Sequence, residues 1–219
     1  MRDSHHDLRD EIEATVERRA KVRQLVDRLT ERLKRLRKRA RKIEARPHVV
    51  VERNVCNQSS RGGAKPRLIV LHSTESPSQK GHADLEGIAA YFDTPSVQAS
   101  SHVVTDPDGD SARCVPDSEK AWTQAAFNSV SLSIEQIGYA SQTVWDERQI
   151  AESARWVARW SKEHGIPIKR GAVLGYAVTR SGVVTHADLG APGGGHADPG
   201  AGYPFDRLLE LARDFRKAL

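Results

Sequence analysis

The stretch LIVLHSTES, residues 68–76, decides the fold of the chain. It begins with the apolar run from Leu68 to Leu71, which is long enough for a buried strand. His72 follows where this strand would emerge from the core, and a polar side chain at such a position often points into a cleft. The stretch therefore predicts a core strand that presents a histidine to a site.

The segments around this strand alternate between extended and helical patterns. Extended patterns occur in residues 100–116, 131–139 and 183–186, and helical patterns in residues 83–92, 146–165 and 204–219. Gly165 closes one of these helices and Pro204 opens another. Because strands and helices interleave, the sequence predicts an α/β fold with a mixed central β-sheet flanked by helices.

Charge separates an N-terminal arm from the rest of the chain. The chain has 219 residues, a length that suits one domain and an extension. Its formal net charge is +5. Residues 1–46 hold 16 of the 34 Lys and Arg but only 9 of the 29 Asp and Glu. Residues 47–66 include the polar, Gly-rich run NQSSRGGAKP. We therefore predict a basic helical arm over 1–46, a linker over 47–66 and one domain over 67–219.

A seam of positions spaced alternately by four and three residues runs through the arm. Its apolar members are Leu8, Ile12, Val22, Val26, Leu29, Leu33, Leu36, Ala40 and Ile43, and Thr15 and Arg19 fill the remaining positions. This spacing favours a coiled coil or a helical hairpin, which Pro47 would end. Since a lone helix with so narrow an apolar stripe gains little from burial, we expect the arm to self-associate.

The run RLKRLRKRARK, residues 32–42, contains eight basic residues. It is either a solvated helix face or an attachment site for a polyanion. Candidate polyanions are a phosphate-rich cell-wall polymer, an anionic membrane surface and nucleic acid. The run has no aromatic side chain on which bases could stack, so it predicts no specific nucleic-acid binding.

Cysteine content and hydropathy exclude several classes of protein. Cys56 and Cys114 are too few for a disulfide framework, and no apolar run approaches the roughly 18–20 residues of a membrane helix. The N-terminal residues lack the apolar region of a secretory signal. We expect the protein to be made in the cytoplasm, so any action outside it needs another route of release.

Residues 185–206, THADLGAPGGGHADPGAGYPFD, contain the tripeptide His-Ala-Asp twice in a stretch rich in Gly and Pro. His186 follows an apolar pair, as His72 does, and the loop after it can turn sharply and return Asp198 to the same place. Catalytic zinc takes three imidazole or carboxylate ligands and leaves a fourth position for water. From these residues alone, a metal site, a duplicated turn and a plain loop all remain open.

Five motifs in chain order resemble the zinc-dependent N-acetylmuramoyl-L-alanine amidases of type 2. These enzymes share a fold with the peptidoglycan recognition proteins and with phage endolysins. The motifs are LIVLHSTES, SSHVV, AW at 121–122, NSVSLSIEQIG, and H-x11-D-P-G-x-x-Y-P-F-D. The resemblance covers roughly residues 66–215 and leaves out the arm.

This resemblance implies a catalytic Zn²⁺ site. His72, His186 and Asp198 match the three zinc ligands of the family, and Glu135 matches its catalytic acid. His196 stands where many members have a Lys that stabilises the oxyanion. A carboxylate in this position can carry a proton to the leaving nitrogen, and a donor opposite the metal can stabilise the oxyanion.

Other positions of the family pattern concern the substrate. Trp122, Asn128 and His102 are candidates for substrate binding, with a structural role as the alternative for His102 and a core position for Trp122. Thr123 stands where the family usually has a His, and Gln136 where an apolar residue is common. The departure at Thr123 concerns the substrate contacts on that side, and the three ligand positions are intact.

The resemblance implies hydrolysis of the amide bond between N-acetylmuramic acid and L-alanine in peptidoglycan. A phage endolysin, released through a holin to lyse the host wall, fits best, and such an enzyme would be antimicrobial. One alternative is a cytosolic amidase that recycles muropeptides, although a basic arm would be unusual on it. Others are a non-catalytic peptidoglycan-binding module, which usually follows loss of a ligand, and a coiled-coil anchoring protein with a vestigial domain.

Overall fold

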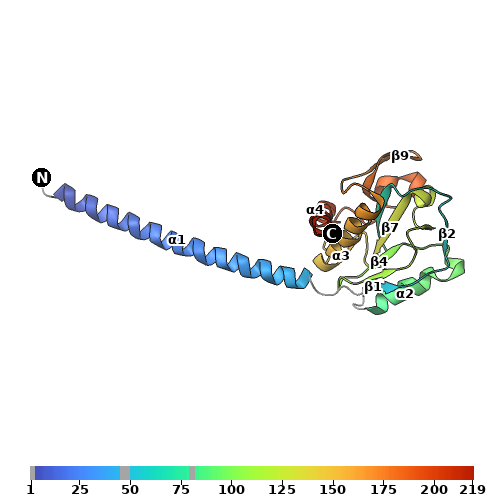
Figure 1. The fold of residues 1–219 in the computed structure, drawn as a ribbon, viewed down its shortest axis with the longest axis horizontal. Helices are drawn as coiled ribbons and strands as arrows, with labels where there is room; N and C mark the ends of the chain where they lie inside the picture. Colours follow the sequence, from blue (N-terminus) through green and yellow to red (C-terminus); the bar gives the residue numbers. More distant parts are fainter. Residues whose placement is uncertain (1–2, 45–49, 79–81) are drawn as a thin grey trace. The chain divides into compact units, whose positions relative to one another are not determined.

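The computed structural model describes residues 3–44, 50–78 and 82–219 (Figure 1). Contacts within the chain divide it into two compact units, Met1–Pro47 and His48–Leu219. Each unit is described by itself. The second unit contains every candidate metal-binding, catalytic and substrate-binding residue named above.

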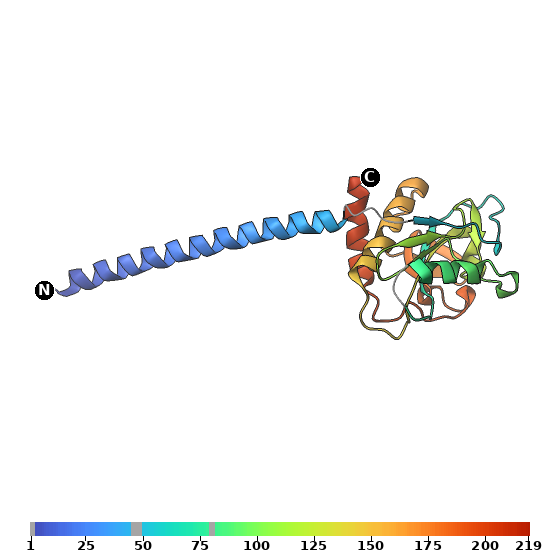
Figure 2. The same ribbon diagram turned by 90° about the horizontal axis from the view of Figure 1, so that it is seen from below.

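The first unit is a single long helix, α1 (Asp3–Glu44), drawn in blue in Figure 2. Neither Gly nor Pro interrupts its 42 residues, and the predicted helical arm is confirmed. The described apolar members of the seam each expose about half of their surface: Leu8, Ile12, Val22, Val26, Leu29 and Leu33. The side chains of Leu36, Ala40 and Ile43 lie outside the described residues, and pairing with a second copy stays a prediction.

The second unit is built on a six-stranded sheet. In spatial order its strands are β1 (Val50–Glu52), β5 (Ser111–Arg113), β4 (Val103–Thr105), β7 (Ser131–Gln136), β3 (Leu68–Ser73) and β10 (Gly182–Thr185). All neighbouring pairs are parallel except β4 and β5, which are antiparallel. The predicted mixed central sheet is confirmed.

Helices cover both faces of this sheet. α3 (Glu147–His164) and α4 (Phe205–Ala218) pack on one face, while α2 (His82–Phe92), η2 (Ala125–Val130) and η3 (Ala187–Leu189) pack on the other. Two further short helices are η1 (Pro95–Val97) and η4 (Ala191–Gly193). None of the helices in the described parts of the chain has both the length and the apolar composition of a membrane span.

Two small antiparallel sheets complete the unit. One pairs β2 (Gln58–Ser60) with β6 (Glu119–Ala121), and the other pairs β8 (Ala172–Leu174) with β9 (Ala177–Arg180). The first of these corrects the linker predicted over 47–66. In the described part of that segment, β1 joins the central sheet and β2 pairs with β6, so these residues belong to the folded unit.

Alternation along β3 sorts its side chains between the two faces of the sheet. Ile69 and Leu71 pack in the core beneath α3 and α4. Leu68 and Val70 pack on the opposite face, with the core that includes η2 and η3. His72 continues this second set at the carboxyl end of the strand, so it emerges on the face away from α3 and α4.

Candidate metal centre

Parallel pairing places His72 and His186 at the same edge of the sheet. Thr185 of β10 is in register with Leu71 of β3, so His186, the next residue, follows at the level of His72. The backbone N–H of His186 donates to the carbonyl of Leu71 at 3.1 Å. The loop after His186 then returns to the site, where the N–H of Ala187 donates to the carbonyl of Asp198 at 3.2 Å.

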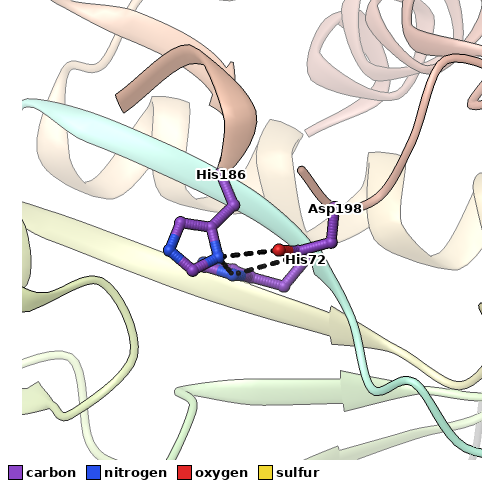
Figure 3. Close-up of side chains that lie close together, drawn as sticks. All are labelled: His72, His186 and Asp198. Atoms are coloured by element: carbon purple, nitrogen blue, oxygen red, sulfur yellow. Dashed lines mark hydrogen bonds and ion pairs between the residues drawn. The ribbon is translucent and has the colours of Figure 1, made fainter. Parts of the chain in front are cut away.

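Three side chains converge there, as Figure 3 shows. The Nδ1 atoms of His72 and His186 are 3.0 Å apart, and the carboxylate of Asp198 lies 2.9 Å from Nδ1 of His186 and 3.3 Å from Nδ1 of His72. Ligand atoms about 2.0–2.1 Å from a tetrahedral zinc ion lie about 3.3 Å from one another. The three buried groups therefore fit a zinc ion, and the structure brings together the three residues predicted as ligands.

The protonation states of two of these groups, His72 and Asp198, suit a cation. Burial lowers the pKa of His72 to about 4. Burial acts to raise the pKa of Asp198, but its contacts with His186 and His72 outweigh burial and hold that pKa well below its usual value. Metal ligands must be neutral imidazoles and ionised carboxylates. The site thus keeps His72 neutral and Asp198 ionised near neutral pH. Burial acts to lower the pKa of His186, but its contact with Asp198 outweighs burial and raises that pKa, so a bound cation would displace a proton from this ring.

The backbone fixes which nitrogen of His186 faces the site. Nε2 lies 2.8 Å from the carbonyl oxygen of Gly193, to which only an N–H can donate. The proton of the neutral ring is therefore on Nε2, and the lone pair of Nδ1 points inward. Asp198 is held in turn by the backbone N–H of Ser73, which donates to Oδ2 at 3.3 Å.

Glu135 lies on β7 directly beside His72 in the parallel register. Its Oε2 is buried and has no hydrogen-bond partner among the described residues. Burial raises its pKa to about 8, and the charges of Asp198 and Glu75 act in the same direction. A carboxyl group with this pKa can both accept and release a proton near neutral pH.

His196, the candidate oxyanion donor, lies at the rim of the site. Its exposed ring stacks on the ring of His186, with 4.7 Å between the centroids and 20° between the planes. The imidazole therefore borders the ligand cluster without being one of its three converging groups.

The three residues proposed for substrate binding lie in different surroundings. Trp122 is half-buried, and its indole N–H donates to Ser59 Oγ at 2.9 Å. Asn128 Oδ1 accepts from the backbone N–H groups of Thr123 and Gln124, so its amide closes the turn before η2. Substrate contacts of Trp122 and Asn128 stay predictions.

His102 has no exposed surface, which corrects its assignment to substrate binding and supports the structural alternative. Arg61 Nη2 lies 2.6 Å from Nε2 of His102. Because a guanidinium only donates, Nε2 must accept and the ring is neutral. Burial, together with the charge of Arg61, lowers the pKa of His102 to about 3.

Glu75 belongs to the site although no sequence pattern singled it out. Its Oε1 accepts from Ser73 Oγ at 2.6 Å and from the backbone N–H of Ala140 at 2.8 Å. Its backbone has φ of 52°, which is uncommon for a residue other than Gly. Strained residues cluster at functional sites, and this one ties the end of β3 to the loop after β7.

A second group of possible ligands is formed by Asp117, Glu163 and His164. Asp117 is paired with Arg113 at 2.9 Å and with His164 at 3.0 Å. An arginine cation already neutralises this carboxylate, so the group is an ion-pair cluster and the buried site is the stronger metal candidate.

Two imidazoles and a carboxylate around one point, next to a carboxyl group of raised pKa, are the groups that a metal-dependent hydrolase needs. A family model described as N-acetylmuramoyl-L-alanine amidase matches residues 62–201. The chain belongs to this family, and it is an amidase that acts on peptidoglycan. The predicted family, fold and enzyme class are confirmed.

Solved structures of similar fold include the hydrolase AmiA of Staphylococcus aureus in complex with its ligand, at 20% identity and a TM-score of 0.61, with 80% of this chain and 86% of that chain covered. The amidase LysC of Clostridium intestinale URNW matches at 15% identity and a TM-score of 0.54, with 75% and 97% covered. At these identities the likeness shows the fold alone. No curated protein matches the chain.

Proposed function

We propose that this amidase is a zinc-dependent phage endolysin that cuts the bond between N-acetylmuramic acid and L-alanine when the host wall is lysed. His72, His186 and Asp198 would hold Zn²⁺. The observation that carries the proposal is the convergence of these three buried side chains beside Glu135. A binding module without activity would need none of this arrangement.

When bound, Zn²⁺ would lower the pKa of a water molecule and polarise the amide carbonyl. Glu135 takes the proton of the attacking water and passes it to the nitrogen of L-alanine as the amide bond breaks. Its raised pKa suits both steps, since the carboxylate must gain the proton and then lose it. His196, at the rim, donates an N–H to the oxyanion, a contact typically worth about 3–4 kcal/mol.

The test of this assignment is Glu135→Gln on purified peptidoglycan. The amide keeps the shape of the side chain but cannot carry the proton, so turnover should fall by about 10²–10⁴-fold. Zinc content should stay at one ion per chain, measured by elemental analysis. Retained turnover would move the proton-transfer role to another residue. A wild-type chain that bound walls without releasing peptide, with or without chelator, would favour the binding module.

The arm separates an endolysin from an amidase that recycles muropeptides. Residues 32–42 carry eight basic residues, which suit an anionic wall polymer or membrane surface and add nothing to the capture of a small soluble substrate. We propose that this run attaches the enzyme to its target, and that a holin releases it to the wall. Neutralising the run to Gln in the full chain should slow lysis of whole walls and leave hydrolysis of soluble muropeptides unchanged. Equal rates on walls would refute the attachment role.

A further inference from the structure

Gln124 is a buried polar residue that the mechanism above does not use. It directly precedes η2, and its side chain has no exposed surface. The side-chain amide of Gln124 contacts the imidazole of His72. Two polar atoms of this pair, Gln124 Oε1 and His72 Nε2, are buried, and neither makes a hydrogen bond of normal geometry in the described parts of the chain.

A short chain of hydrogen bonds fixes the direction of the Gln124 amide. Ser131 Oγ donates its only proton to the carbonyl of Phe127 at 2.6 Å. Toward Gln124 the hydroxyl can therefore only accept, and the group that it contacts is Nε2 of the amide. With the amide nitrogen turned to Ser131, Oε1 is left as an acceptor for a second donor.

We propose that Gln124 is a positioning residue that accepts the Nε2–H of His72 and so turns the Nδ1 lone pair of that ring toward the metal. Gly193 does the same for His186 through its carbonyl oxygen, 2.8 Å from Nε2. Both histidines then present Nδ1 to the centre, in agreement with the 3.0 Å between these atoms. An acceptor behind a histidine fixes its tautomer and its orientation as a ligand.

Two matched variants test this role in the full chain. Gln124→Met keeps the length of the side chain and removes the acceptor, whereas Gln124→Glu keeps an acceptor at the same place. Loss of such a partner typically weakens metal affinity by about 10–100-fold. We expect zinc affinity, measured by competition with a chelator, to fall by this factor in Gln124→Met and to stay near the wild-type value in Gln124→Glu.

A second measurement reports on the imidazole itself. In the metal-free wild type, ¹⁵N NMR should show His72 protonated at Nε2, and Gln124→Met should show a mixture of tautomers. Equal losses of affinity in both variants, or wild-type affinity in Gln124→Met, would overturn the proposal and leave Gln124 as packing.

Ser131→Ala keeps the test decisive if Gln124→Met does not fold. Without the hydroxyl the amide is free to rotate, so zinc should bind several-fold more weakly although Gln124 itself is intact. Unchanged affinity in Ser131→Ala would count against the orienting chain. The inference rests on the proposed zinc site and not on the proposed role in lysis. If the wild type bound no zinc, the proposed zinc site would fail, and the tautomer of His72 in the metal-free wild type and in Gln124→Met would still decide the role of Gln124.

Discussion

Asp198 and Glu135 carry the same chemical group in one site, but their pKa values move in opposite directions. Asp198 faces two imidazoles, which hold its pKa far below the usual value. The buried Oε2 of Glu135 faces no hydrogen-bond donor of the described chain, and burial raises its pKa to about 8. One carboxylate thus stays charged to bind a cation, and the other is able to exchange a proton.

The repeated tripeptide offers a matched pair of substitutions. Asp198→Asn should abolish zinc binding and hydrolysis, because an amide does not supply the negative charge that faces both imidazoles. Asp188→Asn, in the first copy of the tripeptide, should keep both, since Asp188 accepts from Thr185 N and pairs with Arg170 away from the ligands. Zinc content and peptidoglycan hydrolysis measure the outcome. A fully active, zinc-loaded Asp198→Asn protein would refute the ligand assignment.

The lowered pKa of buried His102 predicts how the free energy of unfolding depends on pH. Its pKa in the folded protein is about 3, below the value of about 6.5 in an unfolded chain, so the unfolded state takes up a proton first as pH falls. The neutral His102 ring therefore contributes to the free energy of unfolding above about pH 6.5, and this contribution is lost as the pH falls toward 3. Between about pH 7 and pH 4.5 the loss of this contribution amounts to about 2–3 kcal/mol.

Urea unfolding of the metal-free protein at these two pH values measures the effect. His102→Gln should be less stable than the wild type near pH 7, because a buried hydrogen-bonded ring is lost. It should then lose about 2–3 kcal/mol less than the wild type on acidification. If acidification lowered the free energy of unfolding equally in the two proteins, His102 would have to be protonated already in the folded state.

At the scale of elements, the site depends on the register of β3 with β7 and β10. A slip of one residue would turn His72 from the site face into the core under α3 and α4. The loop that carries Asp198 has no such ladder and depends on close backbone contacts. At Gly200, which has φ of 86°, a Cβ atom would overlap the carbonyl oxygen of Ala140.

Gly200→Ala should therefore displace this loop. We expect weaker zinc binding and a loss of about 1–3 kcal/mol in the free energy of unfolding, from the strained backbone and the overlap together. Gly195→Ala is the control, because Gly195 has φ of 75° in the same loop but nothing within 4 Å of an added Cβ. Chelator competition and thermal unfolding distinguish the two. If both variants lost zinc equally, backbone strain and not the contact with Ala140 would be the cause.

The sequence was most informative where elements are long or strongly patterned. The apolar run of β3 and the amphipathic pattern of α3 were predicted, and the resemblance identified the three ligands. The hairpin of β8 and β9 and the strands β1 and β2 were not predicted. Strands of three or four residues carry little pattern by themselves, and the equally short β4, β5 and β10 were predicted only because their surroundings marked them, such as the apolar pair before His186. Glu75 and Gln124 were missed because their roles depend on contacts with residues distant in sequence, which no local spacing reveals.

At the scale of the whole molecule, the exposed seam of α1 predicts association of the full chain. Val26 and Leu29 lie at adjacent seam positions, and each exposes 53% of its surface. Replacing both with Lys should convert an oligomer into a monomer in sedimentation experiments, because apolar burial between helices would be replaced by repulsion. Glu17→Gln, off the seam, is the control and should keep the wild-type mass. A wild-type chain that sediments as a monomer would refute the seam interpretation.

The three ligands come from residues 72, 186 and 198, so a bound ion ties the carboxyl end of one strand to a glycine-rich loop more than a hundred residues further along. Such a tie acts as a reversible cross-link between distant parts of the polypeptide. Withdrawal of the ion should release the loop locally and open it to proteases before the rest of the domain unfolds. Zinc supply would then govern the lifetime of the enzyme as well as its rate.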